Sequence, residues 1–399
     1  LWYNQETEGQ RTDVRVCNLS YLQTDWYIDQ MKRPAYDSPS VPIDWSRLEY
    51  VSGHNEAVQI QPNMMKHLDE YYRKNPEEAV KNFGENPYEL KNILEHWIRH
   101  PQDEGLRIVP TDSIVVRVDK EAVKRSGMLI PDSLHGVIPD YMHLSLKGKR
   151  VLYKSELMML EMLANTNWER PLYIAITVGS ENHLNLGNNF MLEGLAYRLT
   201  PFNSKETKTS IDADKMYDNL MHKFKFGGID NPDVYLDETT LRMCDTHRRM
   251  FVTLSSELIK REEKEKALEV LDYSLKVIPP ATVPHDYIYS SSKEMAENYI
   301  ALGHPEKALP ILEEMANNAV EYISWYESLD EQRFRDSYET CIRYIYMLDE
   351  INKSYAKLAL APNAEKENIY TKSAVHYSRI FDTLYETFNK RIGANKREK

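Results

Sequence analysis

Residues 296–320 read AENYIALGHPEKALPILEEMANNAV, and this stretch decides the fold of the C-terminal part of the chain. An earlier stretch, SSELIKREEKEKALEVLDYSLKVIP at 255–279, aligns with it without a gap. Ala267 falls on Ala308, and in both stretches a large apolar residue follows four positions later. The two stretches therefore form an internal repeat with an offset of 41 residues, from 255 to 296.

Each repeat has the pattern of two helices that interlock. A small residue early in the second helix, with Leu271 or Leu312 four positions later, resembles a short, divergent tetratricopeptide array, and Tyr299 and Gly303 match the same pattern. The offset exceeds the usual period of roughly 34 residues, so we expect a longer link between the repeats. Pro310 would remove a backbone hydrogen bond inside the second helix, and it predicts a kink or a late start there.

Two more helical segments follow the repeats. Residues 331–361 and 364–392 carry apolar side chains at helical spacing, and Pro362 separates them. We expect the two to pair as a hairpin over the repeats. The sequence thus predicts an all-α, tetratricopeptide-like helical domain at 241–399.

The preceding half, 1–240, alternates strand-like and helix-like segments. Such alternation is typical of α/β proteins, and it predicts an α/β domain with a mixed, mostly parallel sheet. The predicted elements are strands at 14–19, 106–109, 114–118 and 170–178, a hairpin at 143–153, helices within 63–100 and a helix at 188–199.

Polar side chains gather after two of these predicted strands. Ligands collect at the carboxyl ends of parallel strands, so the two segments could line one crevice. In the alternative interpretation they satisfy backbone groups in long turns and cap the next helix. The candidate ligand-binding residues are Asn18, Ser20 and Asp25 in the first segment and Ser180, Glu181, Asn182, His183 and Asn188 in the second.

Tyrosine is abundant, with 27 residues, and several lie beside helical core positions. Concave tetratricopeptide faces bind extended partners, so surplus tyrosines could form a peptide- or sugar-binding groove. Packing between long helices is the alternative interpretation, and the one that the sequence favours. The candidate protein-binding residues are Tyr289, Tyr299, Tyr322 and Tyr326.

The composition argues against several classes of function. A net charge of −12 without a basic stripe argues against nucleic acid as a partner. His96 and His100 share a helical face in HWIRH, but no acidic partner accompanies them, so we expect no metal site. The sequence has no GxSxG, Walker or GxGxxG motif, and we expect no cofactor. Its three cysteines cannot form a disulfide framework.

Three stretches resemble landmarks of a family of multi-span membrane proteins of Bacteroides-type bacteria, which look like protein O-mannosyltransferases of the GT-C class. They are LWYNQETEGQRTDVRVCNLSYLQTDWYI at 1–28, ERPLYIAITV at 169–178 and FMLEGLAYRLTP at 190–201. The resemblance implies that this chain is the C-terminal, non-catalytic part, at the periplasmic face of the inner membrane. The implied partners are an acceptor protein or peptide and the membrane-embedded remainder of the same polypeptide. This part would hold the acceptor or complete one wall of the lumenal face of the transferase. The sugar-transfer residues of that family precede this region, so no catalytic residue is assigned.

The resemblance also gives the first aromatic residues a place. Trp2 and Tyr3 would lie at the level of the membrane interface, where amphipathic aromatics are favoured. In the chain by itself we expect them to fold back onto the α/β domain or to be poorly ordered.

Two other functions stay open. The chain could be a free-standing, tetratricopeptide-like periplasmic adaptor. It could also be an enzyme that binds a small molecule or sugar between 18–25 and 180–189. In that case Asn182→Ala and His183→Ala would abolish turnover while thermal stability holds.

Overall fold

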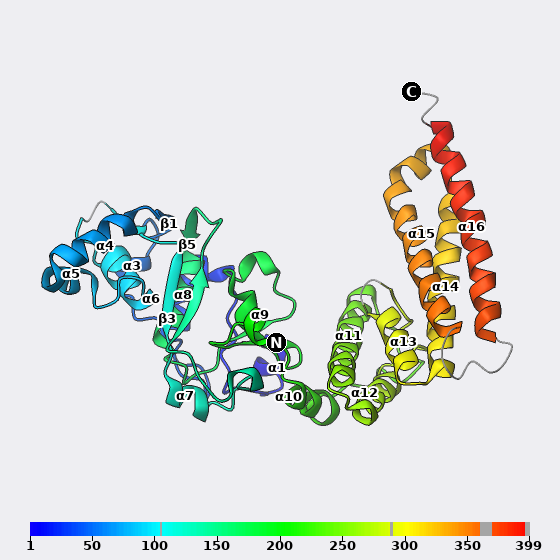
Figure 1. The fold of residues 1–399 in the computed structure, drawn as a ribbon, viewed down its shortest axis with the longest axis horizontal. Helices are drawn as coiled ribbons and strands as arrows, with labels where there is room; N and C mark the ends of the chain where they lie inside the picture. The colour runs from blue at the N-terminus through cyan, green and yellow to red at the C-terminus, as the bar shows by residue number, and fades with distance from the viewer. Residues whose placement is uncertain (104–105, 288–289, 360–368, 396–399) are drawn as a thin grey trace. The chain divides into compact units, whose positions relative to one another are not determined.

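The computed structural model describes the chain except for residues 104–105, 288–289, 360–368 and 396–399 (Figure 1). Contacts within the chain divide it into two compact units. The α/β unit comprises residues 1–192 and 196–212, and the helical unit comprises residues 193–195 and 213–399. The predicted fold class is confirmed, because strands and helices mix in the first unit and the second is helical.

Short strands in the described part of the chain form three small sheets, with the orders β2-β1-β5, β3-β4 and β6-β8-β7. Among the strand ladders of the described residues, β1–β2 is parallel and the other four are antiparallel, so the prediction of a mostly parallel sheet is wrong. Residues 193–195 alone join β7 to β8, which suits an antiparallel hairpin and is too short for the crossover that parallel strands need. The bounds are β1 Ala57–Ile60, β2 Ile108–Val109, β3 Ser113–Arg117, β4 Tyr141–Ser145, β5 Val151–Tyr153, β6 Tyr173–Ala175, β7 Phe190–Leu192 and β8 Ala196–Leu199.

The predicted strand at 14–19 is wrong: the chain bends at Val14, has no regular structure over 15–18 and turns at Leu19. Its polar backbone groups find side chains instead. The N–H of Asn18 donates to the Tyr27 hydroxyl at 2.8 Å, and the carbonyl of Val14 accepts from the Gln5 amide at 2.8 Å. These bonds replace the ladder that the sequence predicted.

The predicted hairpin at 143–153 is also wrong, although a turn lies at Gly148. The two strands around this turn join different sheets, since β4 pairs with β3 and β5 pairs with β1. The predicted helix at 188–199 is the β7–β8 hairpin, whose turn contains Gly194 at a φ of 136° that favours glycine. The strand predicted at 170–178 is confirmed only for β6.

Helices surround these sheets, and the longest buried one in the α/β unit is α8. Leu157 and Met158 on α8 are fully buried with Trp45 and Ile28 in the core of this unit. The helices of the unit are α1 Trp2–Glu6, α2 Asp25–Met31, α3 Arg47–Tyr50, α4 Met64–Lys74, α5 Pro76–Phe83, α6 Leu90–Ile93, α7 Lys120–Arg125, α8 Lys154–Asn165 and α9 Ser204–Thr207. Shorter 3-10 or π turns are η1 Tyr21–Gln23, η2 Leu94–Arg99, η3 Asp132–Leu134, η4 Ser180–Asn182 and η5 Leu186–Asn189.

The helical unit has the repeat that the sequence predicts. Helix α12 begins at Lys264 and α14 begins at Pro305, which keeps the offset of 41 residues, from 264 to 305. Helix α14 begins at the position equivalent to the start of α12 and continues through Pro310, so the predicted late start is wrong. Helices α14, α15 and α16 lie side by side, and the predicted pairing of the last two is confirmed (Figure 1). The bounds are α10 Ala213–Asp218, η6 Asn219–Lys223, α11 Glu238–Lys260, α12 Lys264–Val277, α13 Ser292–Ala301, α14 Pro305–Ser328, α15 Glu331–Ala359 and α16 Ile369–Asn395.

The long helices are amphipathic rather than apolar throughout. In the described ranges of the chain, none of them combines the length and the apolar character needed to cross a membrane.

Candidate functional site

The polar residues predicted in the first segment bond to their own loop. The Asn18 side-chain oxygen accepts from the backbone N–H of Ser20 at 3.0 Å. The Asp25 carboxylate accepts from the N–H of Trp26 at 2.8 Å and lies 3.7 Å from the Arg47 guanidinium. These bonds shape the turn that leads into α2, as Asn and Asp do in many turns.

The polar residues of the second segment also bond locally. The Nε2 atom of His183 lies 3.0 Å from the carbonyl oxygen of Val178, and the Asn182 amide donates to the Glu181 carboxylate at 3.2 Å. Ser180 opens η4, and Asn188 is half-buried in η5. Because residues 14–19 form no strand, the two segments are not the exits of neighbouring strands. Ligand binding by either segment stays a prediction.

The four predicted tyrosines differ in their surroundings. Tyr299 is fully buried, and its hydroxyl donates to Asp272 at 3.0 Å, so it does not belong to an open face. Tyr322 is 48% exposed and stacks on Tyr344, with ring centroids 4.6 Å apart. Tyr326 is half-buried beside the same ring. Tyr289 lies outside the described residues.

Three aromatic side chains near the N-terminus form an exposed cluster, which we call the aromatic patch: Trp2, Tyr21 and Trp26. Their exposed fractions are 45%, 43% and 55%. The rings of Trp2 and Tyr21 stack with centroids 6.4 Å apart, and Tyr21 lies 5.8 Å from Trp26. The buried ring of Tyr27 contacts both Tyr21 and Trp26 edge-on, at 5.5 Å. The patch is therefore supported from below and open to solvent above.

Local polar bonds hold the first residues against this surface. The Gln5 amide on α1 donates to the carbonyls of Arg11 and Val14, each at 2.8 Å, and the Tyr36 hydroxyl donates to Glu6. Trp2 thus folds back onto the α/β unit, which confirms that expectation, whereas Tyr3 stays exposed. The sequence reasoning singled out the polar residues of 18–25 and missed the aromatic ones between them. The spacing of Tyr21 and Trp26 on either side of a short polar turn could have indicated the patch.

A second feature of the α/β unit is a groove of about 520 Å³ beside the turn after α8, which we call the Trp168 groove. Its floor is apolar and mostly buried. Its rim is polar, and the rim side chains are exposed except that of Glu89, which is buried. The floor consists of Leu90, Val116, Val118, Leu163, Ala164 and Trp168, and the rim of Glu89, Lys91, Arg117, Asp119, Asn167 and Glu169.

One wall of the groove is a fixed ion pair. The Arg117 guanidinium donates to both oxygens of Glu89, at 3.2 and 2.9 Å, and this pairing raises the pKa of Arg117. The indole N–H of Trp168 donates to the Arg117 carbonyl at 2.8 Å. Asn167 and Trp168 both have positive φ, 47° and 62°, which is uncommon for a bulky residue. The turn after α8 thus holds Trp168 in an uncommon conformation, and the bond from its indole to the end of β3 fixes the side chain there.

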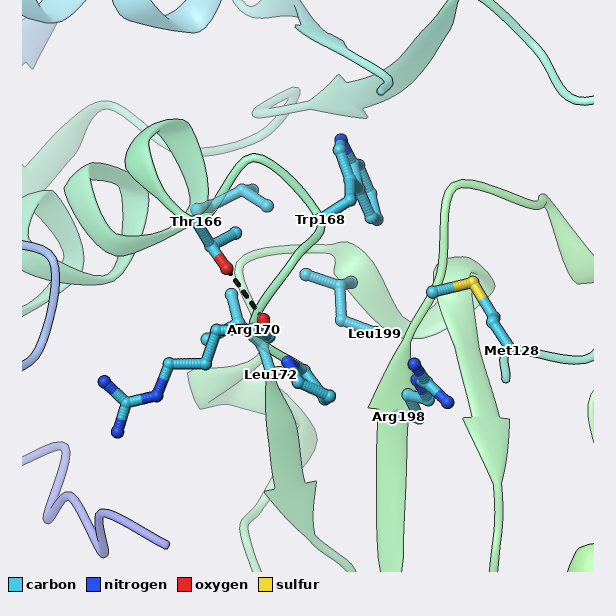
Figure 2. Close-up of a pocket in the computed structure, with 9 residues that line it drawn as sticks. Met128, Thr166, Trp168, Arg170, Leu172, Arg198 and Leu199 are labelled. Carbon is cyan, nitrogen blue, oxygen red and sulfur yellow. Dashed lines mark hydrogen bonds between the residues drawn. The ribbon is translucent and has the colours of Figure 1, made fainter. Parts of the chain in front are cut away.

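The opposite side of this turn offers little space. Figure 2 shows Trp168 and Thr166 above a cavity bounded by Arg198 and Leu199 of β8. The Thr166 hydroxyl donates to the Arg170 carbonyl at 2.7 Å, which closes the turn. This cavity measures about 10 Å³, room for about one water molecule, so it is too small for a ligand.

The two surfaces differ in what they can do. The aromatic patch offers amphipathic rings to an apolar or interfacial partner. The Trp168 groove combines an apolar floor with hydrogen-bond donors and acceptors, as small-ligand and peptide sites do. Within the described part of the chain, no three His, Cys, Asp or Glu side chains lie together as a metal site would require.

Comparison with known proteins gives a family match for the region that contains both surfaces. A family model described as TMEM260-associated domain 2 matches residues 1–216, more than half of the chain. Neither a curated protein nor a solved structure matches the chain. The matched region contains the aromatic patch and the Trp168 groove, and its description names a domain associated with a membrane protein. The chain belongs to the TMEM260-associated domain 2 family.

Proposed function

We propose that this chain is a non-catalytic, extracytoplasmic accessory domain of a membrane-bound protein glycosyltransferase of the protein O-mannosyltransferase-like class. The family match supports an association with a membrane protein. The resemblance of the stretches at 1–28, 169–178 and 190–201 supports the glycosyltransferase class. In this proposal the domain lies at the periplasmic face of the inner membrane and contributes to acceptor binding there.

The observation that carries the proposal is the aromatic patch. Trp and Tyr side chains have an apolar body and a polar tip, and they are enriched where a membrane meets water. Trp2, Tyr21 and Trp26 present three such rings on one surface, each more than two-fifths exposed. Their mutual contacts fix them in place, so little side-chain entropy is lost on insertion. We therefore place this surface at the lipid–water interface.

Fractionation of cells tests the placement. The natural gene, in its own organism, is tagged after its last codon, and membranes are separated from soluble proteins. The proposal expects the tagged product in the inner-membrane fraction. Protease added to intact spheroplasts should remove the tag. A soluble product, or a tag that is digested only after lysis, would contradict the proposal.

A second experiment tests the glycosyltransferase class. Deletion of the gene should remove O-linked hexose from a set of periplasmic proteins, as measured by mass spectrometry of their glycopeptides. Complementation with the Trp2→Ala/Trp26→Ala double variant should restore less modification than complementation with Trp325→Ala. Trp325 lies on α14 and is 54% exposed, so it matches Trp26 in exposure. Unchanged glycopeptides in the deletion strain would exclude the class.

An adaptor function is the second candidate, and one observation favours it. Tyr322 and Trp325 are both about half exposed on α14, and Trp325 contacts Tyr326 with ring centroids 4.7 Å apart. A free adaptor that uses this face would appear in the soluble periplasmic fraction of the same experiment. It would also bring down a partner that the Trp325→Ala variant loses.

A further inference from the structure

The charges around the Trp168 groove do not cancel. Glu89 and Arg117 neutralise each other through two hydrogen bonds. The remaining charged rim residues are Asp119, Glu169 and Lys91, two acids against one base. The C-terminal end of α8 reaches the groove through Leu163 and Ala164, and the carbonyl end of a helix carries partial negative charge. The open part of the groove is therefore electronegative.

The floor of the Trp168 groove, unlike its rim, is apolar. Leu90, Val116 and Val118 are nearly fully buried beneath the rim, and their side chains present apolar surface. A volume of about 520 Å³ is within the range of sites that hold a small ligand or a few residues of a peptide. An apolar side chain would gain from burial on this floor, by roughly 25 cal/mol for each Å² removed from water.

We propose that the Trp168 groove binds an extended peptide segment in which an apolar side chain is followed by Lys or Arg. The apolar side chain fills the floor, and the basic one meets Asp119 and Glu169. Lys91 donates to a carbonyl of the peptide, while the Glu89–Arg117 pair stays a fixed wall. The inference deepens the proposed function, on which its biological meaning rests, because an acceptor protein would present such a segment.

Charge complementarity selects this occupant over its rivals. A phosphorylated or acidic segment would face Asp119, Glu169 and the end of α8 with like charge. A neutral sugar would leave Glu169 without a charged partner, and Asp119 with only the bond that it accepts from the Ala122 N–H at the start of α7. A peptide with one apolar and one basic side chain is the class that uses both the floor and the rim.

Nuclear magnetic resonance of the full chain tests the inference, with the indole N–H of Trp168 as reporter. The signal is assigned by its loss in Trp168→Phe. The probe is the peptide acetyl-GSLKSG-amide, and acetyl-GSLESG-amide is its charge-reversed control. The lysine peptide should shift the Trp168 signal and bind about fivefold more tightly than the glutamate peptide, as a single exposed ion pair of up to about 1 kcal/mol implies. Added salt should reduce the difference in affinity between the two peptides, because it screens the exposed ion pair.

Two variants separate the groove from the rest of the surface. Ala164→Phe fills the groove from a half-buried position on α8 and should abolish the shift. Glu169→Gln should weaken lysine-peptide binding several-fold, while Glu121→Gln on α7, an exposed acid outside the groove, should leave it unchanged. No shift with the lysine peptide, equal binding of both peptides, or a shift that survives Ala164→Phe would each overturn the inference. Fractionation and glycopeptide experiments do not involve this groove, so either proposal can fail alone.

Discussion

In the helical unit, Ala267 and Ala308 are both fully buried at the same place in successive helical hairpins, and Leu271 and Leu312 repeat the match. In the described residues of the α/β unit, the strands and loops follow a different principle. Its strands span two to five residues, and its loops depend on single bonds from side chain to backbone. The Arg170 guanidinium, for example, donates to the carbonyl of Ser40 at 2.8 Å. A repeated apolar contact thus stabilises the helical unit. In the α/β unit, individual polar contacts determine the shape of the loops.

The comparison also bears on function. The aromatic patch and the Trp168 groove both lie in the α/β unit and inside the region that the family model matches. Each is built from loops and element ends, where binding residues are commonly found on a rigid scaffold. The repeated helices instead supply a regular frame. Experiments that separate the two modes of stabilisation therefore also show which residues are free to serve binding.

The largest expected effect is in the repeat. Leu271→Ala and Leu312→Ala should each lower the free energy of unfolding by about 2–5 kcal/mol, because each leaves a cavity in a fully buried site. Equivalent packing predicts that the two costs agree more closely than the roughly 2–5 kcal/mol range that Leu→Ala costs cover at different buried sites. Urea unfolding measures both, with the 77% exposed Leu48→Ala as control. Clearly unequal losses in the free energy of unfolding would show that Leu271 and Leu312 are not packed equivalently.

A pH experiment sharpens the comparison inside the helical unit. Burial lowers the pKa of His285 to about 3, and burial raises the pKa of Asp245 to about 6. Below pH 6.5 the unfolded chain binds a proton at His285 that the folded chain does not, so stability falls as the pH falls. Asp245 acts in the opposite sense between pH 6 and 4, because the folded chain holds the extra proton. Arg248, Asp286 and Glu314 face the same cluster.

The two effects should nearly cancel in the natural sequence and separate in variants. As the pH falls from 6 to 4, the free energy of unfolding of His285→Gln should rise relative to that of the natural sequence by roughly 1.4 kcal/mol per pH unit. The free energy of unfolding of Asp245→Asn should fall relative to the natural sequence by a similar amount. Urea unfolding at pH 4, 5 and 6 measures the slopes. Parallel curves for the two variants would show that neither group titrates as its burial implies.

A smaller effect is expected in the α/β unit. Arg170 donates to the carbonyls of Pro39 and Ser40 and to the Ser38 hydroxyl, so Arg170→Ala should cost roughly 2 kcal/mol. It should also speed proteolytic cleavage within 32–45, the loop that these bonds hold. The exposed Arg107→Ala serves as control and should stay within about 0.5 kcal/mol. An unchanged cleavage rate would mean that the hydrogen bonds from Arg170 do not hold the loop in place.

The same contrast explains how far the sequence predicts the fold. The repeat was predictable because helical spacing and small residues recur at Ala267 and Ala308, and local pattern and tertiary packing agree there. In the α/β unit the segment 188–199 has enough apolar residues for a helix, and tertiary pairing through the turn at Gly194 makes it a hairpin instead. Residues 14–19 have strand-like composition but no neighbouring strand, which no local pattern reveals.

The candidate surfaces were only partly predictable. The segment at 18–25 was singled out for its polar residues, yet its exposed feature is the stacking of Tyr21 with Trp2, which depends on how α1 folds back. The Trp168 groove brings Glu89 and Arg117 together across 28 residues of sequence, next to the positive-φ turn at Trp168. Neither contact leaves a periodic signal in the sequence.

Binding of the full chain to phosphatidylcholine vesicles tests the central claim most directly. The natural sequence and Trp325→Ala should float with the vesicles equally, and the Trp2→Ala/Trp26→Ala variant should bind at least about tenfold more weakly, as the loss of two half-exposed aromatic side chains implies. No flotation of the natural sequence, or an equal loss in Trp325→Ala, would contradict the placement of the aromatic patch at the membrane surface.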